Sequence, residues 1–214
     1  LLEEKHDARE LRRALTEELG DARLSDATTR LLVTSYDLVE RQPHFFKSWR
    51  PERDAPMVDV AHATSAAPSY FEPVALDGRS LVDGGVFATN PAMCAYAEAQ
   101  RLRPGERCYI VSLGCGVQTR SIRHEDAVGW GLIEWVRPII DVVFDGVADT
   151  VDYQLRHLCL EGEYVRLQTV LDRASDALDD ASEANLRLLE QQGRDLVARS
   201  EETLAQVGRR LIAG

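Results

Sequence analysis

The chain has 214 residues, 44% of them hydrophobic, and its 25 basic and 36 acidic side chains give a formal net charge of −11 at pH 7. This length fits one domain with a sizeable core. The acidic balance repels nucleic-acid phosphates at long range and excludes general nucleic-acid binding. No run reaches the roughly 18 apolar residues of a membrane span, and no secretion signal opens the chain, so we expect a soluble protein.

The cysteine and acid patterns favour a protein without metal or cofactor. The four cysteines are Cys94, Cys108, Cys115 and Cys159. They form no Cys-x-x-Cys pair and have no histidine at metal-ligand spacing, which indicates neither a zinc site nor a disulfide framework and fits a reducing cytoplasm. The pair Asp179-Asp180 lacks the glycine and terminal glutamate of a calcium loop, so a solvated helix start is favoured there.

Helical and strand-like patterns alternate along the chain, which predicts an α/β fold. The predicted helices cover residues 1–19, 55–67, 130–160 and 184–212, and another begins at Pro91. The predicted strands cover residues 30–36, 79–82, 108–113 and 163–167. Since strand 108–113 is apolar throughout, we expect a mainly parallel central sheet between helical layers, a three-layer α/β sandwich that holds all four strands.

The helix predicted over residues 130–160 carries a single apolar stripe. The stripe consists of Ile139, Val143, Val147, Val151 and Leu155. Its helical spacing is typical of a buried face, so we assign it to the core, with a kink at Pro138 because proline removes a backbone donor from the helix.

The stretch over residues 80–91 places an ionisable group at the end of a predicted strand. Asp83 follows the apolar strand, Gly84 and Gly85 come next, and Asn90 precedes Pro91 as a plausible helix N-cap. Open α/β sheets bind ligands at this edge, and paired glycines let another backbone or a substrate approach closely. The alternative is a plain turn with Asp83 as a solvated turn residue.

The neighbouring residues favour the functional interpretation. Residues 63–73 read Ala-Thr-Ser-Ala-Ala-Pro-Ser-Tyr-Phe-Glu-Pro, residues 83–85 read Asp-Gly-Gly, and residues 89–91 read Thr-Asn-Pro. This ordered set resembles the patatin-like phospholipases, in which an Ala-Ser-x-Ala-x-Pro helix end, Tyr-Phe-x-Pro, Asp-Gly-Gly and Asn-Asn-Pro follow at this spacing. Thr89 replaces the first asparagine. Linked motifs over about thirty residues are far more specific than one pattern.

The resemblance implies a lipid acyl hydrolase that uses a Ser–Asp dyad on a lipid or other acyl-ester substrate, with no cofactor. Asp83 matches the dyad aspartate, and Gly84 and Gly85 complete its motif. The nucleophile of this family lies on a Gly-x-Ser-x-Gly elbow, preceded by a glycine-rich oxyanion loop. Neither pattern occurs in these 214 residues.

In the family, the elbow and the oxyanion loop precede the Asp-Gly-Gly motif. We therefore expect residues 1–214 to be the C-terminal portion of a patatin-like domain, N-terminally incomplete and inactive alone. The alternative is a non-catalytic patatin-like binding or regulatory module. Headgroup specificity and oligomeric state have no signature in the sequence.

Residues 41–53 interleave basic and aromatic side chains on an otherwise acidic protein. The candidate lipid-interface residues are Phe45, Phe46, Lys47, Trp49 and Arg50. Tryptophan suits a lipid interface and basic groups suit anionic headgroups, which would allow transient membrane-surface contact. The alternative, which the sequence favours, is a β-hairpin that packs its aromatic residues inward.

Residues 112–116, Ser-Leu-Gly-Cys-Gly, resemble the Ser-Leu-Gly-Thr-Gly of patatin-like proteins, with Cys115 in place of threonine. A thiol at a strand end can attack an acyl carbon when a neighbouring base lowers its pKa. No histidine lies near Cys115 in the sequence, so a buried, structural cysteine is favoured.

Overall fold

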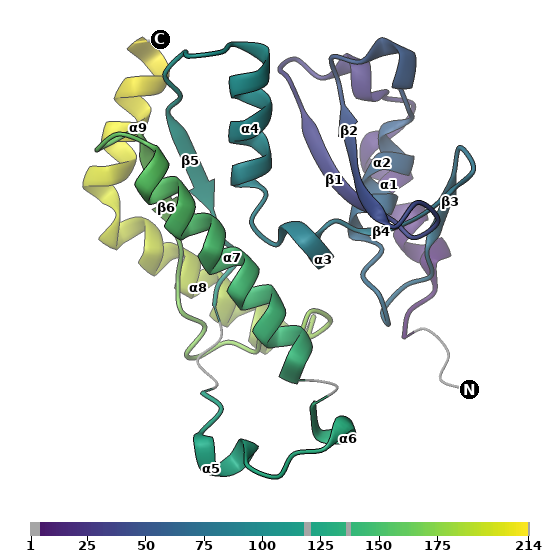
Figure 1. Ribbon diagram of the computed structural model, residues 1–214, viewed down its shortest axis with the longest axis vertical. Helices are drawn as coiled ribbons and strands as arrows, with labels where there is room; N and C mark the ends of the chain where they lie inside the picture. Colours follow the sequence, from purple (N-terminus) through teal and green to yellow (C-terminus); the bar gives the residue numbers. More distant parts are fainter. Residues whose placement is uncertain (1–4, 118–120, 136–137, 214) are drawn as a thin grey trace. The chain divides into compact units, whose positions relative to one another are not determined.

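The structure, a computed structural model, describes residues 5–117, 121–135 and 138–213 (Figure 1). The described residues divide into two compact units, one within Leu1–Ala95 and Gly146–Ala148 and the other within Tyr96–Asp145 and Asp149–Gly214. Helices and strands both contribute, so the α/β class is confirmed. The strands form two separate sheets.

The sheet of the first unit has four strands in the order β2-β1-β4-β3. These strands are β1 (Leu32–Asp37), β2 (Gln42–Lys47), β3 (Val74–Leu76) and β4 (Arg79–Asp83). Every neighbouring pair is antiparallel. Short turns join β1 to β2 and β3 to β4, and such turns reverse the chain direction. Arg41, Asp77 and Gly78 provide the positive φ angles that these turns require.

One face of this sheet is covered by α2 (Met57–Ser65), and α1 (Ala8–Leu19) packs against α2. The carboxylate of Asp7 caps α1 by accepting a hydrogen bond from the Arg9 N–H at 2.9 Å. The core between α2 and the sheet contains Leu24, Phe46, Ala55, Val60, Ala63, Ala66, Val74 and Leu81. Short 3-10 turns at Leu24–Asp26 (η1) and Pro51–Arg53 (η2) lie before α2.

Two helices follow β4: the single turn α3 (Gly85–Ala88) and then α4 (Ala92–Leu102). The helix predicted to begin at Pro91 is therefore present. Asn90 Oδ1 accepts a hydrogen bond from the Ala92 N–H at 3.2 Å, which is the capping contact expected from the sequence.

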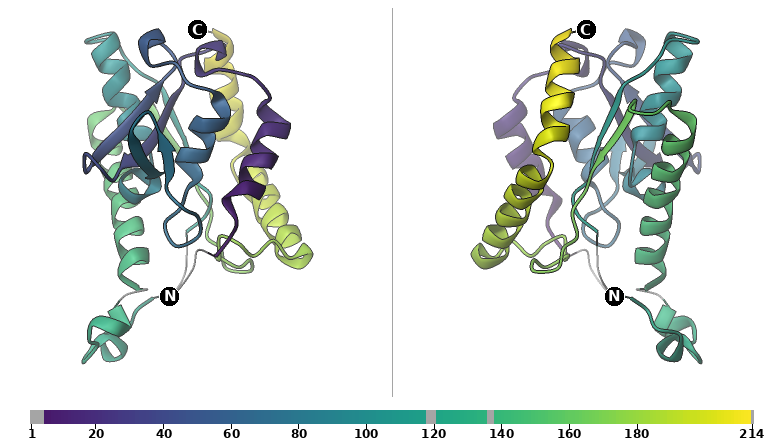
Figure 2. Two further views of the ribbon diagram at one scale, coloured as in Figure 1. Left: turned by 90° about the vertical axis from the view of Figure 1, so that its right-hand side faces the viewer. Right: turned by 90° about the vertical axis from the view of Figure 1, so that its left-hand side faces the viewer.

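The second unit contains two parallel strands, β5 (Ile110–Leu113) and β6 (Tyr164–Leu167). Parallel strands need a long crossover. Helices lie along the chain between them: α5 (His124–Ala127), α6 (Leu132–Trp135) and α7 (Pro138–Leu158). After β6 come α8 (Glu183–Arg199) and α9 (Glu201–Ala213), which meet at a bend that both panels of Figure 2 show.

All four predicted strands form, but the prediction that one sheet holds them is wrong. β1 and β4 are antiparallel neighbours in the first sheet, whereas β5 and β6 form the second. The apolar run over residues 108–113 correctly indicated parallel pairing. β1 and β4 pair antiparallel across the long segment that separates them in the sequence, which the apolar patterns of the two strands did not indicate.

The helix predicted over residues 130–160 is described as α6, up to Trp135, and α7, from Pro138; the expected kink at Pro138 falls beside residues 136–137, which lie outside the described part of the chain. The helix predicted over residues 184–212 is interrupted at Ser200, whose N–H bonds back to the Leu196 and Val197 carbonyls.

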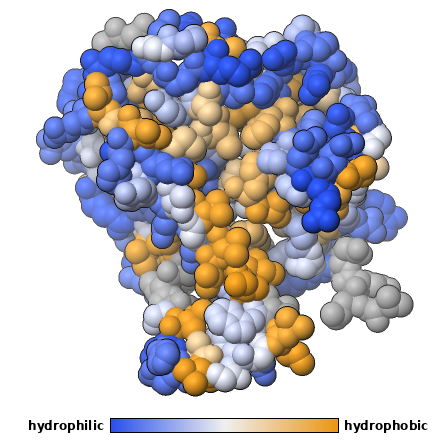
Figure 3. All heavy atoms as spheres, in the orientation of Figure 1, coloured by the Kyte–Doolittle hydropathy of each residue, from blue (hydrophilic) through white to orange (hydrophobic). Residues whose placement is uncertain are grey.

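The apolar stripe of α7 is buried at only one end. Leu155 is fully buried, whereas Ile139 and Val143 are 43% and 46% exposed, so assigning the whole stripe to the core was wrong. Leu132 and Ile133 of α6 are still more exposed, and Figure 3 shows apolar side chains gathered over this region. Among the described helices, none is both long and apolar enough to cross a membrane.

His62 is an unusual member of the buried set in the first unit. Its side chain lies on α2, only 8% of the residue is exposed, and neither ring nitrogen has a hydrogen-bond partner among the described residues. Burial lowers the pKa of His62 below the ordinary value of 6.5, and the Arg12 guanidinium acts in the same direction. Arg12 itself pairs with Asp59 at 2.7 Å, which joins α1 to α2.

We expect His62 to make the fold sensitive to mild acid. The pKa of His62 is lower in the folded state than in the unfolded state, so His62 does not reduce the free energy of unfolding above pH 6.5. As the pH drops below 6.5, the free energy of unfolding falls by up to about 1.4 kcal/mol per pH unit. The free energy of unfolding of the His62→Leu variant should not show this decrease, because leucine does not titrate. Thermal unfolding of both proteins from pH 7.5 to 5 measures the difference; parallel curves would contradict it.

Candidate functional site

Asp83 is the last residue of β4 and lies opposite Ser35 of β1. Its backbone N–H donates to the Ala66 carbonyl at 3.0 Å, and its carboxylate Oδ1 accepts a hydrogen bond from the Gly85 N–H at 2.7 Å. The residue is half-buried. Burial raises the pKa of Asp83 above its ordinary value, and the Gly85 hydrogen bond offsets part of that rise.

The motif segments upstream and downstream of Asp83 meet around it. Ala66 follows the last residue of α2, so the Asp83–Ala66 hydrogen bond joins the helix end to the strand end. Thr64 Oγ1 donates to the Thr34 carbonyl at 2.6 Å, which anchors the same helix end to β1. Downstream, Thr89 Oγ1 donates to the Gly85 carbonyl at 3.0 Å. The motif spacing thus reflects direct contacts.

Gly84 and Gly85 have different physical roles. A Cβ built on Gly84 would lie 2.4 Å from the Thr34 carbonyl oxygen and 2.3 Å from Thr34 Oγ1, which no side chain can occupy. A Cβ on Gly85 would lie 3.1 Å from Asp83 Oδ1. This contact is tight, but it involves a side chain, which can shift, and not the backbone. Gly84 therefore permits β1 to approach, and Gly85 leaves room for the carboxylate.

No serine hydroxyl donates to the Asp83 carboxylate within the described residues. The nearest serine in register, Ser35, is fully buried, and its Oγ donates to the Val82 carbonyl at 2.6 Å. The Ser35 hydroxyl is therefore already used in a hydrogen bond within the sheet. No sequence pattern indicates this buried polar contact, because it depends on the pairing of strands far apart in the chain.

Cys115 is exposed, which corrects the expectation of a buried cysteine. β5 ends at Leu113, itself 72% exposed, and pairing resumes at Val117, which bridges Val170, so Cys115 lies in a short irregular stretch between two paired positions. Gly116 has φ of 115°, a conformation that glycine adopts readily. Among the described residues, no hydrogen bond joins the Cys115 thiol to a histidine, so the structure offers no base for a thiol nucleophile.

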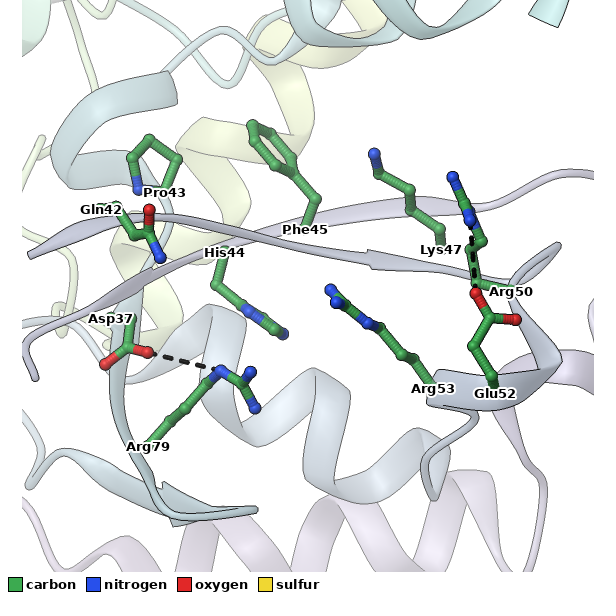
Figure 4. A pocket seen from close by; sticks show the side chains of 10 residues that line it. All are labelled: Asp37, Gln42, Pro43, His44, Phe45, Lys47, Arg50, Glu52, Arg53 and Arg79. Carbon is green, nitrogen blue, oxygen red and sulfur yellow. Dashed lines mark hydrogen bonds and ion pairs between the residues drawn. The ribbon is translucent and has the colours of Figure 1, made fainter. Parts of the chain in front are cut away.

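The basic-aromatic segment forms a β-hairpin with β1, as the favoured alternative predicted. Phe46 is 5% exposed and belongs to the core, so it is removed from the candidate lipid interface. Phe45 packs edge-on against Phe87, and Lys47 Nζ lies 5.4 Å from the Phe45 ring centre. Figure 4 shows Phe45, Lys47 and Arg50 pointing away from the side of the strands on which His44 lies.

Metal-binding side chains do not cluster in the part of the chain that the structure describes: no group of three or more His, Cys, Asp or Glu residues could hold an ion. Asp180 instead accepts a hydrogen bond from the Ser182 N–H at 3.2 Å, and Ser182 is the N-cap of α8. Asp179 and Asp180 therefore lie in a half-buried turn just before the N-cap of α8, and not in a solvated first turn of the helix.

Residues 2–96 match the family model described as patatin-like phospholipase. Patatin-like protein 2 of Arabidopsis thaliana is 32% identical over 90% of this chain and 57% of its own length. Probable inactive patatin-3-Kuras 1 of Solanum tuberosum is 30% identical over 94% and 62%, and patatin-like protein 2 of Oryza sativa subsp. indica is 32% identical over 85% and 55%.

These matches confirm the resemblance to patatin-like phospholipases that the motifs indicated. The matched segment includes Asp83, Gly84 and Gly85. The chain spans about 55–62% of the length of the curated relatives it matches.

We expect the two glycines of the motif to differ sharply on substitution. Gly84→Ala should destabilise the protein by at least the roughly 1–3 kcal/mol typical of overpacking, because its methyl group would overlap the Thr34 backbone. Gly85→Ala, the matched control, should cost less because the Asp83 side chain can shift. Urea unfolding midpoints measure both. Equal losses would show that the Thr34 contact does not determine the need for glycine.

Proposed function

We propose that this chain is the portion of a patatin-like lipid acyl hydrolase that carries the dyad aspartate, with Asp83 in that role. The observation that carries the proposal is the Asp83 carboxylate, half-buried at a strand end inside a set of family motifs that touch one another. At the family level, the match to phospholipases supports hydrolysis of lipid acyl esters.

Asp83 would act as the general base toward a serine nucleophile. One carboxylate oxygen is held by the Gly85 N–H, which fixes the orientation of the group and leaves the other oxygen to accept the hydroxyl proton. An aspartate is a weak base at its ordinary pKa near 3.8, and partial burial makes it a stronger one. Attack on the ester carbonyl would break the ester C–O bond, form an acyl-serine and release the alcohol, which takes the proton held by Asp83; water would then hydrolyse the acyl-serine to the free acid and restore the serine.

The nucleophile and the oxyanion donors would come from residues outside this sequence, since it contains no Gly-x-Ser-x-Gly. On this proposal, residues 1–214 are the C-terminal part of the domain and are inactive alone. The three-layer arrangement would belong to the whole domain. Phe45, Lys47, Trp49 and Arg50 remain candidates for contact with a lipid surface.

A non-catalytic binding or regulatory module is the second candidate. One relative is named a probable inactive patatin. Similarity at this level is therefore compatible with a protein that lacks hydrolase activity. The two candidates differ in whether ester hydrolysis depends on Asp83.

Substitution of Asp83 tests the proposal directly in the whole protein that contains residues 1–214. Asp83→Asn should abolish hydrolysis of a p-nitrophenyl acyl ester, because the amide cannot take a proton, while its Oδ1 still accepts the Gly85 N–H and preserves the fold. Cys115→Ser is the control and should keep its activity. Activity of Asp83→Asn above about a tenth of wild type would contradict the role of Asp83.

The pH dependence of hydrolysis gives an independent measurement. Since the carboxylate must be ionised and its pKa is raised, kcat/KM should fall with decreasing pH at a midpoint above 3.8. The wild type and Cys115→Ser should share this midpoint. A rate that stays constant down to pH 3.8 would exclude Asp83 as the titrating base.

A further inference from the structure

A cavity of about 360 Å³ opens in the first unit around β2. Its walls come from β1, β2, β4 and η2, and Figure 4 shows the side chains that line it. The volume falls within the range of about 300–1,000 Å³ that small-molecule sites occupy. Eight of its ten lining residues belong to the basic-aromatic segment over residues 41–53, and the other two, Asp37 and Arg79, come from β1 and β4.

Three nitrogen-bearing side chains converge on the cavity: His44 of β2, Arg53 of η2 and Arg79 of β4 (Figure 4). Arg79 Nε lies 3.4 Å from Asp37 Oδ2, and Asp37 is only 2% exposed, so this ion pair holds the Arg79 side chain at the cavity wall. Asp37 is itself fixed by the Val39 N–H, which donates to its Oδ1 at 2.9 Å.

The acids at the cavity are already paired. Asp37 faces Arg79, and Glu52 pairs with Arg50 at 3.3 Å. Arg53 has no ion pair and its side chain has no hydrogen bond among the described residues, although its guanidinium points toward His44 (Figure 4). A local excess of positive charge thus faces an open cavity in a chain whose net charge is −11.

We propose that this cavity binds a phosphoryl group, with the guanidinium groups of Arg53 and Arg79 and the imidazole of His44 as donors. A guanidinium presents a planar fork of N–H groups that matches two phosphate oxygens, and hydrogen bonds between charged partners are the strongest available. Two arginines and a histidine from three elements supply donors around one centre. The phosphoryl group could belong to free phosphate, a soluble phosphate ester or a lipid headgroup.

The site is separate from Asp83 and does not rest on the proposed hydrolysis. Arg79 begins β4 and Asp83 ends it, so the two residues lie about 13 Å apart along one strand. Leu81, between them, is fully buried. A phosphate at the cavity therefore would not touch the Asp83 carboxylate.

His44 provides a local signal of occupancy. Burial lowers its pKa, and so does the Arg79 guanidinium; Asp37 and Asp77 oppose this effect, and Arg53 adds to it. A bound anion would offset the two guanidinium charges, so inorganic phosphate should raise the pKa of His44. An NMR titration of the histidine ring protons with and without phosphate measures this change.

The first arm of the test uses inorganic phosphate and calorimetry at constant ionic strength. Arg53→Gln should weaken binding at least tenfold, and Arg53 has no partner whose loss would unfold the protein. Arg30→Gln is the matched control, because Arg30 is exposed, lies outside the cavity and carries the same charge. It should leave affinity within twofold. Absence of saturable phosphate binding to the wild type, or equal weakening by both substitutions, would overturn the proposal.

The second arm identifies the source of the phosphoryl group. Vesicles of phosphatidylcholine are compared with vesicles that also contain phosphatidic acid, in a flotation assay with the wild type, Arg53→Gln and Arg30→Gln. Binding that requires phosphatidic acid and Arg53 supports the site with a lipid headgroup as ligand. Saturable phosphate binding without vesicle binding supports it with a soluble phosphate ester. Vesicle binding that all three proteins share, without phosphate binding, would refute the site.

Discussion

The close approach of Gly84 to the backbone of Thr34 is the constraint on which the first unit depends. With any side chain at position 84, an atom would lie within about 2.5 Å of β1 backbone, and β4 could not keep its register. That register places Asp83 opposite Ser35 and Leu81 opposite Asp37. It therefore sets the position of the carboxylate, and it also aligns Asp37 with the start of β4, where Arg79 reaches it.

β4 carries opposite charges at its two ends and a buried middle. Arg79 begins the strand, Asp83 ends it, and Leu81 and Val82 between them are almost fully buried. A short, packed strand is a rigid support, since its side chains cannot shift without disturbing the core. The half-burial that raises the pKa of Asp83 and the ion pair that holds Arg79 both follow from this one element.

The family match and the compact units describe the same division of the chain. The matched segment ends at residue 96, and the first unit consists of Leu1–Ala95 together with the short segment Gly146–Ala148. Similarity to curated patatin-like proteins nevertheless continues over 85–94% of the chain, so the second unit is also part of the resemblance. Apart from the Gly-Cys-Gly turn after β5, the shared motifs lie in the first unit, at the end of α2, at the end of β4 and at the start of α4.

The sequence by itself determined the local features: four strand segments, the capped start of α4, and an aspartate at a strand end followed by two glycines. These local features depend on residues only a few positions apart in the sequence, through their secondary-structure propensities and the turns they favour. Linked motifs also indicated the resemblance to patatin-like phospholipases, because each segment had its own signature.

Only the tertiary structure decided which strands pair and which side chains meet. It places β1 and β4 in one sheet and β5 and β6 in another. It also buries Phe46 while leaving Ile139 exposed, and it shows that Gly84 is needed because the Thr34 backbone lies against it. It also brought His44, Arg53 and Arg79 to one cavity. Contacts of this kind join residues roughly 10 to 50 positions apart, and bringing such residues together costs loop-closure entropy. Packing across the whole fold offsets this cost, so local sequence patterns do not specify these contacts.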